Sequence, residues 1–224
     1  NIVTLTVTDN SNNSSTCEAI ITVIDEVAPE AICQDVTVQL DEYGIGTTSA
    51  DLVDNGSSDA CGIASIVLSQ TDFDCTHVGP VNVELTVTDN NNNSSSCDAV
   101  VTVVDNIAPE ALCQDVTVTL DAAGVGSTTA ASVDGGSNDA CGIATVVLSQ
   151  TDFDCSFIGD NPVTLTVTDI NNNASTCQAV VSVIDNIAPS AMCQGVSVLL
   201  DDNGLGSLQA IDVDNNSTDN CTIQ

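Results

Sequence analysis

The aspartates and asparagines of this chain gather in three kinds of polar segment, and each kind recurs along the sequence. The first is a short linker: VIDEVAP at 23–29, VVDNIAP at 103–109 and VIDNIAP at 183–189. The second is a loop: VDNGSSDACG at 53–62, VDGGSNDACG at 133–142 and VDNNSTDNCT at 213–222. The third is TDNNNNSS at 88–95 and TDINNNAS at 168–175. Carboxylates, amide carbonyls and backbone oxygens are hard ligands, which calcium binds in groups of about six to eight.

These segments would meet if the chain folded as immunoglobulin-like sandwiches, with the linker beside the loop after the second strand and the last hairpin loop. The alternative is that aspartate, asparagine and glycine form ordinary turns, which explains any single segment. Three segments at every junction, with no lysine or arginine in the chain, favour calcium instead. We predict three groups of metal ligands: Asp25, Asp54, Asp59 and Asp89; Asp105, Asp134, Asp139 and Asp169; and Asp185, Asp214 and Asp219.

The 11 cysteines also recur at fixed places, and none of them forms a CxxC pair. This spacing argues against zinc and against a thioredoxin-like redox site, and it favours structural disulfides in an oxidising compartment. Four cysteines in a repeat allow three connectivities. We predict the bonds Cys33–Cys61, Cys75–Cys97, Cys113–Cys141, Cys155–Cys177 and Cys193–Cys221. Each would close a loop of about 20–30 residues, worth roughly 3–4 kcal/mol.

The two ends of the chain favour this connectivity over the others. The last segment then holds a complete pair, and the first holds only Cys17, whose partner would lie before residue 1. On this reading the odd cysteine reflects a window cut from a longer chain, and no reactive thiol is needed. Completion of the two ends by a second copy, head to tail, would leave Cys17 unpaired and one strand absent.

The polar segments and cysteines belong to an 80-residue repeat that runs through the whole chain. CQDVTV begins at Cys33 and Cys113 and returns as CQGVSV at Cys193, and LTVTD begins at Leu5, Leu85 and Leu165. A fixed period of this size marks an array of small domains of one design. Such arrays usually provide length, spacing or multivalency, whereas a catalytic site is usually built once. We therefore do not expect an enzyme.

Each repeat has the pattern of an all-β domain. Val36, Val38 and Leu40 alternate with polar residues, which indicates a strand with one buried face. We predict strands at 32–40, 46–52, 63–70, 81–88 and 97–104, a shorter one near Phe73, and no helix. The expected fold is a tandem array of immunoglobulin- or fibronectin-like antiparallel β-sandwiches in an extended rod. Residues 27–106 and 107–186 would be complete repeats, 1–26 the C-terminal strands of a preceding repeat and 187–224 the N-terminal strands of a following one.

The charge of the chain is extreme. Thirty-two acidic residues, no lysine or arginine and one histidine give a formal net charge of -32. A nucleic-acid surface needs cations against phosphate and is excluded. Such a chain repels itself unless something else, such as divalent ions, supplies positive charge. No signal peptide or membrane-spanning segment is visible in this window.

The order of CQDVTV, VDNGSSDACG, FDC, LTVTDNNNNSSSC and VVDNIAPEA resembles hyalin-repeat modules over essentially the whole chain. Such modules occur in tandem in large secreted and cell-surface proteins of bacteria, including adhesins, and in animal extracellular matrix. The resemblance implies a sandwich fold with an adhesive or scaffolding role, although these hairpins carry asparagine where the family often has glycine. The linker also resembles the calcium-rigidified linker of cadherins, which supports calcium by analogy.

Other motifs carry less weight. Asp72 and Asp74 of TDFD could form a carboxylate pair, but the motif recurs beside a cysteine, which favours a strand edge or calcium over catalysis. His77 becomes Phe157 in the next repeat, so no Ser-His-Asp constellation is repeated. Asparagine sequons at the hairpin tips, which we expect to be the most exposed ones, make glycosylation candidates of Asn13, Asn93 and Asn173.

We therefore expect a structural segment of an extracellular filament or adhesin stalk, secreted or displayed at a cell surface. Its partners would be neighbouring repeats of the same chain, other copies in a fibre, and attached glycans. The alternative is a repeated adhesion module that binds carbohydrate or protein. The near-identity of the repeats and an aromatic content of only 2% favour the structural reading.

Overall fold

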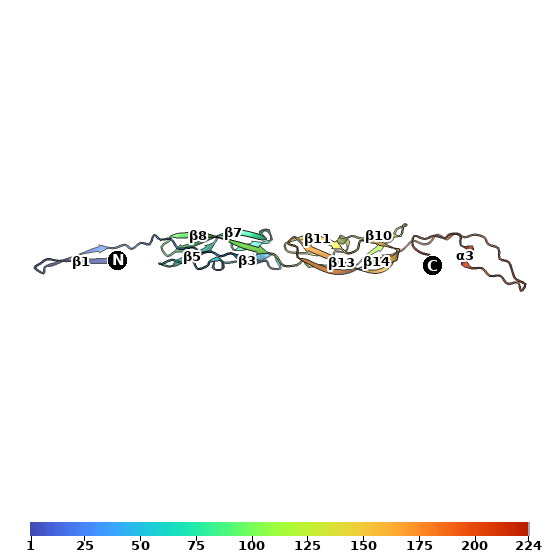
Figure 1. The fold of residues 1–224 in the computed structure, drawn as a ribbon, viewed down its shortest axis with the longest axis horizontal. Helices are drawn as coiled ribbons and strands as arrows, with labels where there is room; N and C mark the ends of the chain where they lie inside the picture. Colours follow the sequence, from blue (N-terminus) through green and yellow to red (C-terminus); the bar gives the residue numbers. More distant parts are fainter. Residues whose placement is uncertain (224) are drawn as a thin grey trace. The chain divides into compact units, whose positions relative to one another are not determined.

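The computed structural model describes residues 1–223. The chain is almost entirely β and forms two compact units, Asn1–Asp105 and Asn106–Gln224, each built around one β-sandwich (Figure 1). The finer division of the sequence into 1–26, 27–106, 107–186 and 187–224 remains a prediction. Within the described part of the chain, no helix is long and apolar enough to cross a membrane.

The first unit begins with an antiparallel hairpin of β1 (Ile2–Thr8) and β2 (Ser14–Ile20). The elements of its sandwich follow in the order β3 (Val36–Gln39), β4 (Ile45–Thr47), α1 (Ala50–Val53), β5 (Ile63–Leu68), β6 (Asp72–Asp74), η1 (Cys75–His77), β7 (Gly79–Asp89) and β8 (Ser94–Val104). One sheet has the strand order β3-β8-β7-β5, and the second sheet pairs β4 with β6.

The second unit repeats this sandwich. Its elements are β9 (Val116–Thr119), β10 (Val125–Ser127), α2 (Ala130–Val133), β11 (Ile143–Leu148), β12 (Asp152–Asp154), η2 (Cys155–Phe157), β13 (Gly159–Asp169) and β14 (Ala174–Ile184). The larger sheet has the strand order β11-β13-β14-β9, and β10 pairs with β12. A short helix, α3 (Ala210–Val213), follows in the last segment.

The core of each sandwich follows from the alternation of side chains along the long strands. In β7, Val83, Leu85 and Val87 are buried, whereas the residues between them are exposed or half-buried. Successive side chains of a strand point to opposite faces, so one face of the larger sheet supplies the core. Phe73 of the smaller sheet is also buried. The core is therefore light, being aliphatic apart from this one ring.

The structure confirms the all-β sandwich and changes two details. The predicted strand at 46–52 is wrong over its second half, because residues 50–53 form the helical turn α1, closed by a 2.8 Å hydrogen bond from the Asp54 amide to the Ala50 carbonyl. The sandwich is also not purely antiparallel, because β3 pairs with β8 in parallel. These two strands lie at opposite ends of the repeat, so no hairpin forces them to run in opposite directions.

The predicted disulfide pairing is wrong. The structure joins Cys33 to Cys97 and Cys113 to Cys177, each pair 64 residues apart, and joins Cys155 to Cys221. The bonds that are therefore not formed are Cys33–Cys61, Cys75–Cys97, Cys113–Cys141, Cys155–Cys177 and Cys193–Cys221. The physical reason is the parallel pairing of β3 with β8, which brings the cysteine just before β3 to a Cα–Cα distance of 6.0 Å from the cysteine within β8.

The remaining cysteines fall into two groups. Cys75 and Cys141 are disulfide-bonded. Cys17, Cys61 and Cys193 form no disulfide among residues 1–223, and all three are exposed. The Cys155–Cys221 bond spans the linker at 183–189, so it ties the sandwich of the second unit to the segment that follows it.

The first and last segments of the chain expose apolar side chains. In β1, Leu5 is 59% exposed, whereas Leu85, at the same position of the repeat, is 0% exposed. In the last segment, Leu200 is 67% exposed, whereas its counterpart Leu40 is 1% exposed. The core-forming faces of these two segments are thus uncovered within their own units.

Candidate functional site

The hairpin loop between β7 and β8 provides the first part of the candidate site. Asn92 has a φ of 70°, a left-handed conformation that asparagine tolerates better than most residues. The buried Asp89 carboxylate accepts 2.8 Å hydrogen bonds from the backbone amides of Asn91 and Asn93 and from the Asn93 side chain. Burial raises the pKa of Asp89, but these hydrogen bonds outweigh it, so the pKa is lowered overall. The carboxylate is therefore ionised at neutral pH.

Asn93 also fastens the linker to this hairpin. Its Nδ2 atom donates to the backbone carbonyls of Asp25 at 3.2 Å and Val27 at 3.3 Å. The Ser95 hydroxyl donates to the Pro29 carbonyl at 2.6 Å. The linker backbone that carries the Asp25 side chain is therefore held against the hairpin that follows β7.

The loop after α1 brings a further carboxylate to the same place. The Oδ1 atom of Asp59 accepts hydrogen bonds from the amides of Cys61 at 2.7 Å and Gly62 at 3.1 Å, which fixes the carboxylate on its loop. Three side chains meet here: Asp25, Asp59 and Cys61 each have one potential ligand atom within 4.8 Å of those of the other two. The predicted meeting of the linker with this loop therefore occurs in the first unit.

The Cys61 thiol lies among carboxylates, and this decides what the group can bind. Its pKa is raised, first by a hydrogen bond to Asp25, then by the charge of Asp25, by burial, and by the charges of Asp59 and Asp89. A protonated thiol is a weak metal ligand and a weak nucleophile. The group therefore offers oxygen ligands to a hard cation, and it is poorly suited to zinc or to thiol chemistry.

A related set of oxygens lies at the linker of the second unit. The Oδ1 atom of Asp185 accepts hydrogen bonds from the Ile187 amide at 3.0 Å and from Asn220 Nδ2 at 3.1 Å. The Oδ1 atoms of Asp219 and Asn220 are buried and have no hydrogen-bond partner among residues 1–223. Buried oxygens without donors are unfavourable, and a cation would satisfy them.

Asp54, Asp134 and Asp214 each bond a turn of their own loop, and their part in a calcium site remains a prediction. Each accepts a hydrogen bond of 2.9–3.0 Å from the backbone amide of the serine three residues later. The side-chain hydrogen bond from that serine is the main cause of a lowered pKa in all three. These carboxylates hold turns, and the group around Asp25 does not include Asp54.

The remaining predicted ligands also hold their own loops. Asp139 and Asp169 accept backbone hydrogen bonds in the second unit as Asp59 and Asp89 do in the first. Asp105 is buried at the end of the first unit. Their participation in one calcium site remains a prediction.

Two of the three glycosylation candidates are part of this framework. Asn93 and Asn173 are half-buried, and their Nδ2 atoms, where a glycan would attach, donate 2.8 Å hydrogen bonds to Asp89 and Asp169. Asn13 is exposed. The expectation that the hairpin tips are exposed therefore fails for Asn93 and Asn173, because their side chains point back into the loop.

Sequence reasoning did not assign the positioning role of the last asparagine in each hairpin loop. A signal for it exists in the sequence, because an asparagine follows an aspartate by four residues at 9–13, 89–93 and 169–173. In all three loops its Nδ2 atom bonds that aspartate. The four-residue spacing lets the asparagine amide reach the aspartate carboxylate across a tight loop. A glycosylation sequon by itself does not require an aspartate at that position.

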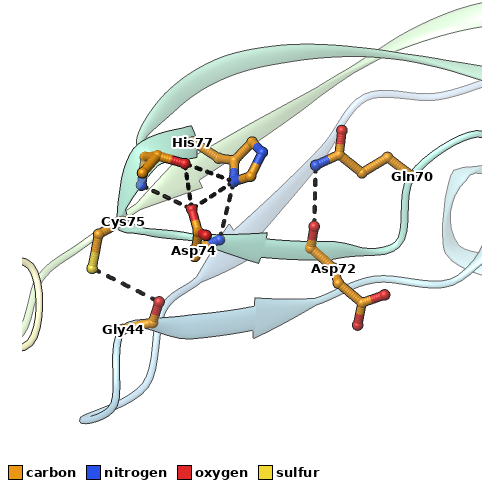
Figure 2. A network of polar contacts seen from close by, with 7 residues as sticks. Gly44, Gln70, Asp72, Asp74, Cys75 and His77 are labelled. Carbon is orange, nitrogen blue, oxygen red and sulfur yellow. Dashed lines mark hydrogen bonds and ion pairs between the residues drawn. The ribbon is translucent and has the colours of Figure 1, made fainter.

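The TDFD motif forms the edge strand β6 and the cap of η1, as Figure 2 shows. Asp74 accepts hydrogen bonds from the Thr76 hydroxyl at 2.5 Å and the Thr76 amide at 2.9 Å, and its carboxylate lies 2.8 Å from His77 Nδ1. The Thr76 hydroxyl is the main cause of the lowered pKa of Asp74. Asp72 instead accepts a 2.8 Å bond from the Thr71 hydroxyl. Each carboxylate thus serves local structure.

The sequence matches no protein-family model and no curated protein. Among solved structures, it is similar to mouse clustered PcdhgC3 EC1-3, at 14% identity and a TM-score of 0.35, over 82% of this chain and 77% of that chain. It is also similar to the Protocadherin GammaB4 extracellular domain, at 16% identity and a TM-score of 0.37, over 87% of this chain and 39% of that chain. A third similar structure is human mucin-like protocadherin EC1-2, at 13% identity and a TM-score of 0.32, over 70% of this chain and 98% of that chain. The sandwich assignment rests on the strand order and core described above.

Proposed function

We propose that this chain is a structural segment of an extracellular filament or adhesin stalk, built from disulfide-bonded, calcium-stabilised repeats of the hyalin type. The observation that carries this proposal is the Cys155–Cys221 bond, which ties one sandwich to the segment beyond its linker. A covalent tie across a linker keeps consecutive repeats together, and that property serves a scaffold. Stable disulfides also suit an extracellular location.

The placement of the aromatic residues supports a scaffold over a carbohydrate- or protein-binding module. The chain has three phenylalanines and one tyrosine, and Phe73 and Phe153 are buried in the two cores. Binding surfaces are usually enriched in exposed aromatic side chains. Tyr43 is exposed, but Ala123 replaces it in the next repeat, so it gives no repeated binding surface.

Calcium is proposed as the ion that completes each linker site. The oxygens of Asp25 and Asp59 in the first unit, and the buried Oδ1 atoms of Asp219 and Asn220 in the second, are hard ligands. The chain carries no lysine or arginine to neutralise them. When bound, calcium would supply positive charge and join the linker to the neighbouring loops.

Calorimetry in calcium and in chelator tests the ion. We expect calcium to raise the melting temperature, because a ligand that binds only the folded state stabilises it by about 2.7 kcal/mol at a hundred times its Kd. Asp59→Asn should reduce this response, whereas Asp51→Asn, which changes an exposed carboxylate on α1, should preserve it. Identical melting curves in calcium and in chelator would exclude a stabilising calcium site.

Small-angle scattering tests the scaffold role separately. We expect an extended particle in calcium, with greater flexibility after chelation, because the like charges of neighbouring repeats favour extension. Each repeat should advance the chain by roughly 30–45 Å, since strands rise about 3.3 Å per residue. A compact particle in both conditions would contradict the scaffold proposal.

A further inference from the structure

Within residues 27–186, four asparagines begin an Asn-X-Ser sequon, the acceptor sequence for asparagine-linked glycans: Asn55, Asn92, Asn93 and Asn173. The sequon requires a hydroxyl group two residues after the asparagine, so the enzyme that transfers the glycan has to reach both side chains. The bulk of a glycan also confines it to the surface of a folded domain. The burial and hydrogen bonds of each pair of side chains therefore decide which sequon the folded chain presents.

Asn93 cannot accept a glycan without losing contacts to the linker. Its Nδ2 atom donates to Asp89 Oδ2 at 2.8 Å and to the backbone carbonyls of Asp25 at 3.2 Å and Val27 at 3.3 Å. An asparagine amide carries two hydrogens, and a glycan would replace one of them. At least one of these three acceptors would then lose its donor, and the glycan would have to lie where the linker lies.

The hydroxyl groups of the Asn93 and Asn173 sequons are also engaged. Ser95, two residues after Asn93, is half-buried, and its hydroxyl donates to the Pro29 carbonyl at 2.6 Å. Ser175, two residues after Asn173, is half-buried too, and its hydroxyl donates at 2.5 Å to the proline carbonyl of the linker that precedes the second sandwich. Both sequons are therefore closed in the folded chain.

Asn92 presents its sequon to solvent. The side chains of Asn92 and Ser94 are exposed. The backbone amide of Asn92 donates to the Asp89 carbonyl at 3.3 Å, which holds the tip of the hairpin without using the Asn92 side chain. Asn172, at the same position of the second sandwich, is exposed as well, but Ala174 replaces Ser94 there and removes the sequon.

The Asn55 sequon is only partly accessible. Asn55 is exposed, whereas Ser57 is half-buried. The Ser57 hydroxyl accepts a 2.9 Å hydrogen bond from the Ile32 amide and bonds the Asp54 carboxylate. An enzyme would have to break these bonds to reach the hydroxyl, so we expect Asn55 to be a poorer acceptor than Asn92.

We propose that Asn92 is a glycan acceptor of the folded chain and that Asn93 and Asn173 are not. The donor is an oligosaccharide joined through its C1 atom to a lipid diphosphate. A bond forms between Asn92 Nδ2 and C1 while the bond from C1 to the diphosphate oxygen breaks. The lipid diphosphate leaves with that electron pair, and a base takes one proton of the amide. This step needs the extracellular location proposed above, but it needs neither calcium nor the scaffold role.

The test supplies the oxidised 224-residue chain with a lipid-linked oligosaccharide and an oligosaccharyltransferase that accepts the plain sequon. After reduction, a protease that cleaves before aspartate places Asn92 and Asn93 in one peptide, 89–97, and Asn173 in another, 169–184. Electron-transfer fragmentation then identifies the occupied asparagine. We expect occupancy of Asn92 to be at least about tenfold higher than that of the other two, which become reachable only when their loops open. In the reduced, unfolded chain this preference should disappear.

Two variants separate access from the sequence of the sequon. Asn92→Gly removes the acceptor but tolerates the left-handed backbone, and it keeps the Asn93 sequon, so the folded hairpin should carry no glycan. Ala174→Ser creates a sequon at Asn172 and should add a glycan to the second sandwich.

Four results would overturn the proposal: an unmodified Asn92 in the folded chain, equal occupancy of Asn92 and Asn93, a hairpin glycan that persists in Asn92→Gly, or an unmodified Asn172 in Ala174→Ser. Because the test supplies both enzyme and donor, none of these results would bear on the calorimetric and scattering tests of the function proposed above.

Discussion

Most individual carboxylates of this chain accept hydrogen bonds from the loops that contain them. Asp154 caps η2 by accepting hydrogen bonds from the Ser156 amide at 2.8 Å and the Ser156 hydroxyl at 2.5 Å. These bonds, led by the hydroxyl, lower the pKa of Asp154. Folding therefore favours the ionised form, and its contribution to stability depends on pH.

We predict that Asp154→Asn lowers the stability of the second unit by an amount that depends on pH. Because the folded pKa lies below the ordinary value of 3.8, the contribution is complete above that pH and is lost as the pH falls through the folded pKa. The wild type should melt about 1–2 °C above the variant at pH 6, and the difference should shrink to zero toward strong acid. Scanning calorimetry in chelator checks this, and a constant difference down to strong acid would contradict it.

The contact of the His77 ring with the Asp74 carboxylate should contribute little to stability. His77 lies edge-on to Phe73 with ring centroids 5.9 Å apart, and Phe157, whose ring is uncharged, lies edge-on to Phe153 at 5.7 Å in the second unit. His77→Phe should therefore change the melting temperature of the first unit by less than about 2 °C. A loss above about 5 °C would show that the polar contact of His77 with Asp74 is needed.

At this scale, sequence reasoning could locate the acidic segments but could not show which carboxylates face the linker and which bond only their own loop. Asp54 and Asp59 lie five residues apart in one loop, and both types of role use the same carboxylate. Only the fold shows that Asp54 faces its serine and Asp59 faces the linker. The distinction depends on side-chain direction, which composition and spacing do not encode.

At the scale of elements, glycines on the short strands allow the two sheets to approach. A Cβ added at Gly126 of β10 would lie 2.6 Å from Val118 Cγ1 and 3.1 Å from the Thr119 carbonyl oxygen. We predict that Gly126→Ala destabilises the second unit by about 1–3 kcal/mol, through overpacking. Chemical denaturation monitored on that unit measures the effect.

Gly195 provides the matched control, because a Cβ added there meets no atom within 4 Å. Gly195→Ala should be neutral or slightly stabilising, by roughly 0.4–1 kcal/mol, since alanine restricts the unfolded chain. Equal losses in the two variants would show that the cost at Gly126 comes from the backbone and not from packing.

Most strands could be predicted from sequence, because alternation reports a half-buried face directly. The parallel pairing of β3 with β8 could not, because it joins the two ends of a repeat and depends on the closed topology. The disulfide error follows from this, since Cys33 and Cys97 are neighbours only through that pairing. The two ends of the chain favoured bonds that close loops of about 20–30 residues, whereas the Cys33–Cys97 bond spans 64 residues.

At the scale of the whole molecule, disulfides compensate for light cores. The Cys113–Cys177 bond spans 64 residues, for which the chain-entropy account gives about 4 kcal/mol. We predict that replacing both cysteines by alanine lowers the free energy of unfolding of the second unit by about 4 kcal/mol. Cys17→Ser, at a cysteine without a bond in the described chain, should cause none. Guanidinium unfolding of the oxidised proteins measures both, and an unchanged midpoint in the double variant would contradict the prediction.

The same bond has a mechanical consequence. When the chain is pulled lengthwise, the sulfur bridge from Cys113 to Cys177 prevents these two residues from separating, so the 64-residue span between them cannot extend to its full length. At about 3.5 Å for each extended residue, roughly 220 Å of slack is withheld from every such repeat. An oxidised repeat can therefore lengthen by only a short distance under tension, whereas reduction of the disulfide would allow the whole span to extend.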